Sequence, residues 1–157
     1  MKNLNILLLT TILAFTTNCG FKVVDRSKLS NFSIIDITTV GENRINYKLK
    51  NKLAFYKNEN SQTLVTLNID TLKKKIVKER NIKNEITKYE ISITAKVKFN
   101  LLENKNFKEF TLIKKGEYNV SEQYSRTLTS EKKLIDILVE ELSQEILSEV
   151  TANLYDI

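Results

Sequence analysis

The chain has 157 residues, of which 41% are hydrophobic and 28% are charged, a balance typical of one globular domain. It contains no histidine, no tryptophan, no proline and a single cysteine. These absences exclude imidazole catalysis, histidine-based zinc sites, an internal disulfide and a Cys-X-X-Cys motif. With only three glycines, the chain has no glycine-rich phosphate-binding loop. Its net charge of +6 favours an anionic partner. Composition therefore favours binding or assembly over catalysis, with no cofactor and no metal.

The first 18 residues are typical of a secretion signal. Lys2 and the amino terminus supply positive charge, and an apolar stretch follows from Leu4 to Phe15. This stretch has about 12 residues, whereas a helix that spans a membrane needs about 20. We therefore expect residues 1–18 to be a removed signal peptide, and an uncleaved membrane anchor is the alternative.

The only cysteine, Cys19, directly follows the apolar stretch. A bacterial lipoprotein signal places its lipidated residue there, because the thiol must accept a diacylglyceryl group before cleavage. Asn18 and Thr16 depart from the small residue and the leucine that usually precede this cysteine. Gly20 stands where an aspartate would signal retention in the inner membrane. We predict lipidation at Cys19 and anchoring, with palmitate among the acyl chains, on the periplasmic side of the outer membrane.

The rest of the chain is predicted to be a tether, residues 19–31, followed by one domain, residues 32–157. The domain begins with a short strand at Phe32–Thr38 and an amphipathic helix at Glu42–Tyr56. The helix is indicated by one apolar stripe at Ile45, Leu49, Leu53 and Tyr56. A strand at Leu64–Ile69 follows, in which alternate residues are apolar.

The apolar pattern changes after Asp70, where hydrophobic residues move to the even positions Leu72 and Ile76. This change predicts a bulge or kink in one long strand, or alternatively two strands. The clearest strand pattern spans Tyr89–Leu101, where apolar and polar residues alternate strictly, as in an antiparallel strand with one buried face.

A polar turn at Glu103–Asn106 leads to a hairpin partner at Phe107–Val120, with Gly116 expected at a bend. The last element is a helix of about 25 residues, capped by Thr129 or Ser130 and with a carboxylate in its first turn. Its apolar stripe comprises Leu134, Leu138, Leu142, Ile146 and Val150. Together these elements predict an α+β fold, a two-layer sandwich in which two helices pack on one face of a mainly antiparallel four-stranded sheet in the order β-α-β-β-β-α.

Positive charge is concentrated in the sheet region. Residues 19–120 contain 21 Lys or Arg and 11 Asp or Glu, whereas residues 121–157 contain 3 and 8. The densest basic cluster consists of Lys73, Lys74, Lys75, Lys78, Arg80 and Lys83. Such a cluster at a sheet edge either discourages edge-to-edge pairing or binds phosphate-bearing groups. Nucleic acid is disfavoured as a partner, because the cluster lacks interleaved aromatic residues.

Several segments resemble the LPS-assembly lipoprotein family, LptE. They are Cys19-Gly20-Phe21 at the mature amino terminus and Tyr118-Asn119-Val120-Ser121 before the last helix. Between them, the helix Glu42–Tyr56 and the strand Tyr89–Leu101 occur in the family's order. Tyr124 and the spacing from Leu142 to Ile146 also fit the family's last helix. The sequence differs from the family in lacking the proline after Cys-Gly-Phe and the Ala- and Arg-rich last helix.

The resemblance implies a non-enzymatic role at the outer membrane. Family members plug the lumen of the β-barrel LPS translocon, LptD, help this barrel to fold, and bind lipopolysaccharide during its delivery to the cell surface. An LptD-like barrel and lipopolysaccharide are therefore the implied partners. The candidate residues for contacting lipid A phosphates are Lys73, Lys74, Lys75, Lys78 and Arg80.

Two other functional classes are open to the sequence. One is an accessory periplasmic lipoprotein of a lipid-transporting ABC system. The other is an enzyme with a Ser/Lys dyad, either Ser92 with Lys96 or Ser130 with Lys132. Alternating exposure on a strand explains the first pair and helix capping explains the second, so we expect no enzymatic activity.

Overall fold

The computed structural model describes residues 32–56, 61, 63–101 and 107–155. The predicted signal peptide, the predicted lipidation site Cys19, the predicted tether and the predicted turn at Glu103–Asn106 lie outside the described residues. The elements, in chain order, are β1 (Phe32–Gly41), α2 (Asn43–Ala54), β2 (Thr63–Arg80), β3 (Ile86–Leu101), β4 (Phe107–Asn119) and α3 (Tyr124–Tyr155).

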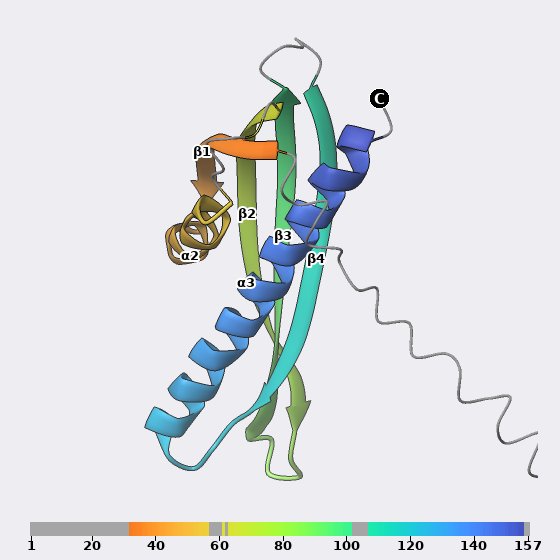
Figure 1. The fold of residues 1–157 in the computed structure, drawn as a ribbon. Coiled ribbons are helices and arrows are strands. Elements are labelled where there is room, and N and C mark those ends of the chain that lie inside the picture. Colours follow the sequence, from red (N-terminus) through yellow and green to blue (C-terminus); the bar gives the residue numbers. More distant parts are fainter. Residues whose placement is uncertain (1–31, 57–60, 62, 102–106, 156–157) are drawn as a thin grey trace, which may run out of the picture.

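The four strands form one sheet in the order β1-β2-β3-β4 (Figure 1). β1 is parallel to β2, because α2 connects them, and the other two pairs are antiparallel hairpin neighbours. α3 crosses the sheet diagonally, and α2 lies beside β1 and contacts α3. The predicted α+β fold and its order of elements are therefore confirmed. None of the helices in the described segments is long and apolar enough to cross a membrane.

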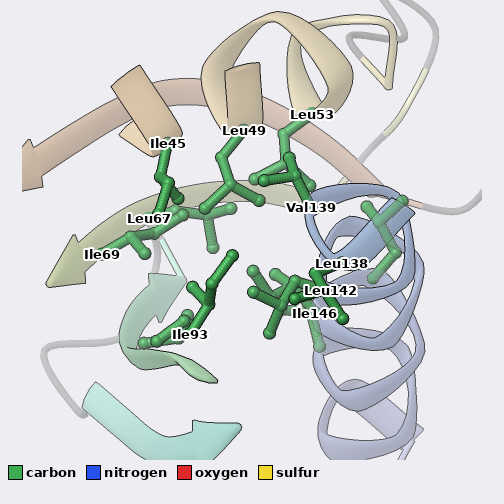
Figure 2. Close-up of a cluster of buried hydrophobic side chains, with 14 of the residues drawn as sticks. Ile45, Leu49, Leu53, Leu67, Ile69, Ile93, Leu138, Val139, Leu142 and Ile146 are labelled. Carbon is green, nitrogen blue, oxygen red and sulfur yellow. The ribbon is translucent and has the colours of Figure 1, made fainter. Parts of the chain in front are cut away.

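The hydrophobic core lies between the two helices and the inner face of the sheet. Figure 2 shows side chains from α2, α3, β2 and β3 directed toward one another. The labelled core residues are Ile45, Leu49, Leu53, Leu67, Ile69, Ile93, Leu138, Val139, Leu142 and Ile146, all of them buried. The apolar stripes predicted for both helices supply these contacts, so amphipathic periodicity accounts for the packing.

The change of pattern after Asp70 marks neither a bulge at that point nor a second strand, whereas the expectation of one long strand is confirmed. β2 pairs with β3 without interruption from Val65 to Val77, and its register shifts only beyond Val77. The hydrophobic pattern changes because the environment of the strand changes. Beyond the core, the inner position Thr71 is buried but hydrogen-bonded to Asn46, while Leu72 and Ile76 are about half exposed.

The link from β1 to α2 depends on Gly41 and Thr71. Gly41 has a φ of +97°, a left-handed conformation that glycine adopts without strain. The amide of Glu42 donates to the Thr71 hydroxyl at 3.1 Å, and this hydroxyl donates to Asn46 Oδ1 at 2.6 Å. This polar junction satisfies the buried Thr71 side chain and fixes the start of α2 against β2.

The sequence analysis expects Gly116 to lie at a bend, but the structure gives this glycine another role. It pairs in register with Ile91 within β4. A Cβ atom at this position would lie 2.5 Å from Leu134 Cδ1. Glycine therefore permits the close approach of α3 to the edge of the sheet.

α3 is longer than the sequence predicts, because it begins at Tyr124 rather than near Thr129 or Ser130. Its start is organised by Ser121 and Thr127: the Ser121 amide donates to the Thr127 hydroxyl at 2.9 Å, and that hydroxyl donates back to the Ser121 carbonyl. Thr129 instead donates to the Ser125 carbonyl within the helix. The first turns carry little buried apolar surface, so hydrophobic periodicity gave no signal for them.

Candidate functional site

The predicted basic cluster lies on a free stretch of β2. β1 pairs with β2 only as far as Thr71, so among the described strands Leu72–Arg80 has β3 as its single neighbour. The cluster therefore borders an edge of the sheet, as expected, although β2 is a central strand over the first half of its length.

The five candidate residues do not converge on one surface. Alternation along β2 places Lys73 and Lys75 on the inner face, toward α3, and Lys74 on the outer face, which no helix of the described residues covers. Lys78 also reaches residues of the outer face, and the guanidinium of Arg80 donates to the Asn84 carbonyl at 2.8 Å. A ligand that touched all five would have to wrap around the strand edge.

Lys75 lies within a compact cluster of charged and aromatic groups. Its Nζ is 2.7 Å from Glu131 Oε2 on α3, and the Tyr118 hydroxyl donates to the same carboxylate at 2.9 Å. The ammonium also lies 4.3 Å from the ring centre of Tyr89 and 5.3 Å from that of Tyr118. A cation between a carboxylate and two aromatic rings is strongly held, so Lys75 ties β2 to α3.

The pKa values of this cluster reflect mutual stabilisation of charge. Burial alone would lower the pKa of Lys75, but its contacts with Glu131 and Tyr118 outweigh burial and raise it. Burial alone would raise the pKa of Glu131, but hydrogen bonds from Lys75 and Tyr118 lower it. Burial, followed by the hydrogen bond to Glu131, raises the pKa of Tyr118. Lys75 and Glu131 are therefore an ion pair across the neutral pH range.

Most of the other candidates also have partners. Lys73 lies 3.5 Å from Glu42. Lys78 lies 3.0 Å from Glu90 and 3.4 Å from Glu117, and the hydrogen bond with Glu90 raises its pKa. Within the described residues, Lys74 is the only one of the five candidates with no ion pair or hydrogen bond of its side chain.

Much of the opposite charge on the sheet region and on the last helix is paired within the fold. Acidic residues of α3 pair with lysines from α2, β2 and β4. The pairs are Lys48–Asp136, Lys52–Glu140, Lys75–Glu131 and Lys114–Glu145. The acidic helix and the basic sheet are thus complementary parts of one fold, and the basic sheet alone is weak evidence for an anionic partner.

The described residues also form two surface hollows that the sequence analysis did not predict. One, of about 410 Å³, lies on the outer face and is bordered by side chains that include Asp36, Lys98 and Phe107. The other, of about 180 Å³, lies between α2 and α3 and is lined by Arg44, Lys48, Lys132, Ile135 and Asp136. The second brings together residues far apart in sequence. Its only sequence signal is the spacing of four between the basic residues of α2 that flank the apolar stripe.

Comparison with solved structures relates the fold to bacterial lipoproteins. Rare lipoprotein B from Shewanella oneidensis is 10% identical, with a TM-score of 0.58, covering 77% of this chain and 97% of that chain. A protein from Caulobacter crescentus described as a lipoprotein is 13% identical, with a TM-score of 0.58, covering 83% and 94%. Lipoprotein B from Nitrosomonas europaea is 14% identical, with a TM-score of 0.52, covering 79% and 85%.

No family model matches the chain, and no curated protein matches it in sequence. At these identities the likeness concerns the fold alone. The chain therefore has the α+β fold of these lipoproteins, which it covers over 85–97% of their length.

Proposed function

We propose that this chain is a non-enzymatic, lipid-anchored outer-membrane subunit of the lipopolysaccharide translocon. In this role it assists the assembly of an LptD-like β-barrel, plugs its lumen, and binds lipopolysaccharide for insertion at the cell surface. The observation that carries the proposal is the shared fold with rare lipoprotein B. The resemblance of Cys19-Gly20-Phe21 and Tyr118-Asn119-Val120-Ser121 to the family supports it independently of the structure.

The outer face of the sheet suits contact with a barrel wall. Leu72, Thr94 and Ile113 are aligned across β2, β3 and β4 on this face. Rows of polar residues lie on both sides of this aligned row. Leu72 and Ile113 are 53% and 55% exposed. A large barrel has a polar interior, so a plug needs a mixed surface of hydroxyl, amide, charged and a few apolar groups rather than a hydrophobic one.

Lipopolysaccharide binding would start at Lys74. Its ammonium is exposed on the outer face, without a carboxylate partner among the described residues, and it can meet a lipid A phosphate directly. Lys78 would follow by exchanging its carboxylate partners for phosphate, since its own side chain is 47% exposed and its pair with the exposed Glu117 is weak. Lys75 would be the last of the three lysines to bind phosphate, because it would first have to lose its contacts with a carboxylate and with aromatic rings.

The first experiment is to purify the full chain from membranes through a carboxy-terminal tag and to identify its partners by mass. A stoichiometric large β-barrel supports the proposal. Subunits of an inner-membrane transporter would instead favour an accessory lipoprotein of a lipid-transporting ABC system and overturn it.

A second experiment tests the lipopolysaccharide contact. We expect Lys74→Glu to weaken binding of purified lipopolysaccharide by about tenfold, because one phosphate contact becomes a repulsion. Lys50→Glu on α2 is the matched control, since it makes the same change of charge at an exposed lysine remote from the cluster. Equal binding by both variants would contradict the assignment of Lys74.

A further inference from the structure

The interface between α2 and α3 contains a regular ladder of charged residues. Lys48 pairs with Asp136, and Lys52 pairs with Glu140. In both pairs the partners are 88 positions apart, and on each helix successive members are four residues apart. One turn of an α-helix spans about four residues, so these pairs are consecutive rungs between two packed helices.

The same register continues to a third rung, formed by Arg44 and Lys132. Lys132 is again 88 positions after Arg44. Both residues line the hollow of about 180 Å³ between the helices, together with Lys48 and Asp136 of the next rung. The third rung therefore brings two cations together, and within the described residues neither of them has an ion-pair partner.

Arg44 and Lys132 are both exposed at the mouth of the hollow, where solvent screens part of their repulsion, but neither has a carboxylate partner among the described residues. The rungs at Lys48 and Lys52, with buried Ile45 and Leu49 beside them, fix the register of the helices. Arg44 and Lys132 are therefore held on the same rung, and the buried Ile135 lines the hollow with them. Unlike the other two rungs, the third rung therefore carries no negative charge of its own.

We propose that this hollow binds a phosphate group, with Arg44 of α2 and Lys132 of α3 as its ligands and Lys48 beside them in the lining. A guanidinium presents paired N–H donors that match phosphate oxygens, and an ammonium adds a compact charge. Asp136 is already engaged by Lys48, so the hollow has a net positive charge. The site is separate from the basic cluster of β2, and the inference does not depend on the translocon role.

The test uses the full chain purified in detergent and measures its melting temperature, Tm. Inorganic phosphate is compared with sodium chloride at equal ionic strength, because general screening must be separated from binding. We expect phosphate at about ten times its dissociation constant to raise Tm by about 3–5 °C. Short-chain phosphatidic acid that remains monomeric serves as the second ligand.

Three variants make the test specific. Lys132→Glu and Arg44→Glu each convert the third rung into an ion pair, so we expect Tm without phosphate to hold or rise and the phosphate-dependent increase to disappear. Lys133→Glu is the matched control, with the same change of charge on an adjacent exposed residue of α3 that does not line the hollow. It should keep the full increase.

The two ligands identify the source of the phosphate group. If both ligands raise Tm and Lys132→Glu abolishes both increases, the site recognises the phosphate group whether or not a lipid carries it. An increase with phosphatidic acid only, lost in the same variant, supports a lipid headgroup as the ligand. No increase with either ligand, or an increase that survives both Lys132→Glu and Arg44→Glu, would overturn the proposal.

Discussion

Glu131 holds together the charged cluster between β2, β4 and α3. Its carboxylate accepts from Lys75 and Tyr118, and its side chain is only 18% exposed. We expect Glu131→Gln to lower the free energy of unfolding by about 1–2 kcal/mol at neutral pH, because a charge-assisted contact is replaced by a weaker amide contact. Urea unfolding of both proteins measures the difference.

This difference should depend on pH in one direction. The pKa of Glu131 is below its usual 4.5 in the folded protein, so its contribution is complete above that value and is lost as the pH falls through the folded pKa. The two proteins should therefore converge in stability as the pH falls below 4.5 and through the lowered pKa of Glu131. Glu122→Gln, at an exposed residue before α3, is the control and should change nothing. A difference that grew on acidification would contradict this role.

Gly41 and Gly116 differ in how they tolerate a side chain. A Cβ at Gly41 would lie 2.0 Å from the Thr71 carbonyl oxygen, and its φ of +97° disfavours any other residue. We expect Gly41→Ala to lower the free energy of unfolding, measured in urea, by more than about 2 kcal/mol. The atom in the way belongs to the backbone of Thr71, which cannot move aside as a flexible side chain can. Gly116→Ala meets the end of the Leu134 side chain and should cost clearly less. Equal losses would show that the Thr71 contact does not govern this junction.

At the scale of elements, the sequence predicts what depends on periodic burial. The alternation along β3 and the stripes of both helices correspond to buried residues, because a single face of each element meets the core. The length of β2 and the first turns of α3 could not be read in this way. Leu72 and Ile76 lie beyond the core, and α3 begins with polar capping contacts rather than buried apolar residues.

The pairing of elements was predictable only for local connections. The hairpin of β3 and β4 follows from a short polar turn, and β1 lies parallel to β2 because a helix joins them. The glycine of β4 illustrates the limit. Whether Gly116 marks a bend or a close contact depends on Leu134 of α3, which the sequence of β4 does not contain.

At the scale of the whole molecule, charge was the least predictable property. The sequence identified the basic residues of β2 correctly but assigned them all to one ligand site. Partners of Lys75 and Lys78 come from α3, β3 and β4, so their availability depends on tertiary contacts. For the same reason the pairing of Arg44 with Lys132 could not be predicted, since the spacing of basic residues on α2 does not show which residues of α3 lie beside them.

The outer face of the sheet offers a test of the whole-molecule proposal. Ile113 on β4 is 55% exposed there, and it alternates with Leu112, whose side chain packs against the core on the inner face. We expect Ile113→Glu to change the free energy of unfolding by less than about 1 kcal/mol, as exposed strand substitutions do. The same variant should reduce recovery of the proposed β-barrel partner several-fold, because a charge would replace an apolar contact at the proposed interface.

Ile137→Glu provides the comparison, since Ile137 is 46% exposed but lies on α3, on the opposite side of the molecule from the outer face. Recovery of the barrel through the carboxy-terminal tag should be close to that of the unmodified chain for this variant. If the barrel surrounded the whole domain tightly, both variants would lose it equally, and if the outer face were free, neither would. A selective loss with Ile113→Glu would identify the bare face of the sheet as the surface that meets the barrel wall.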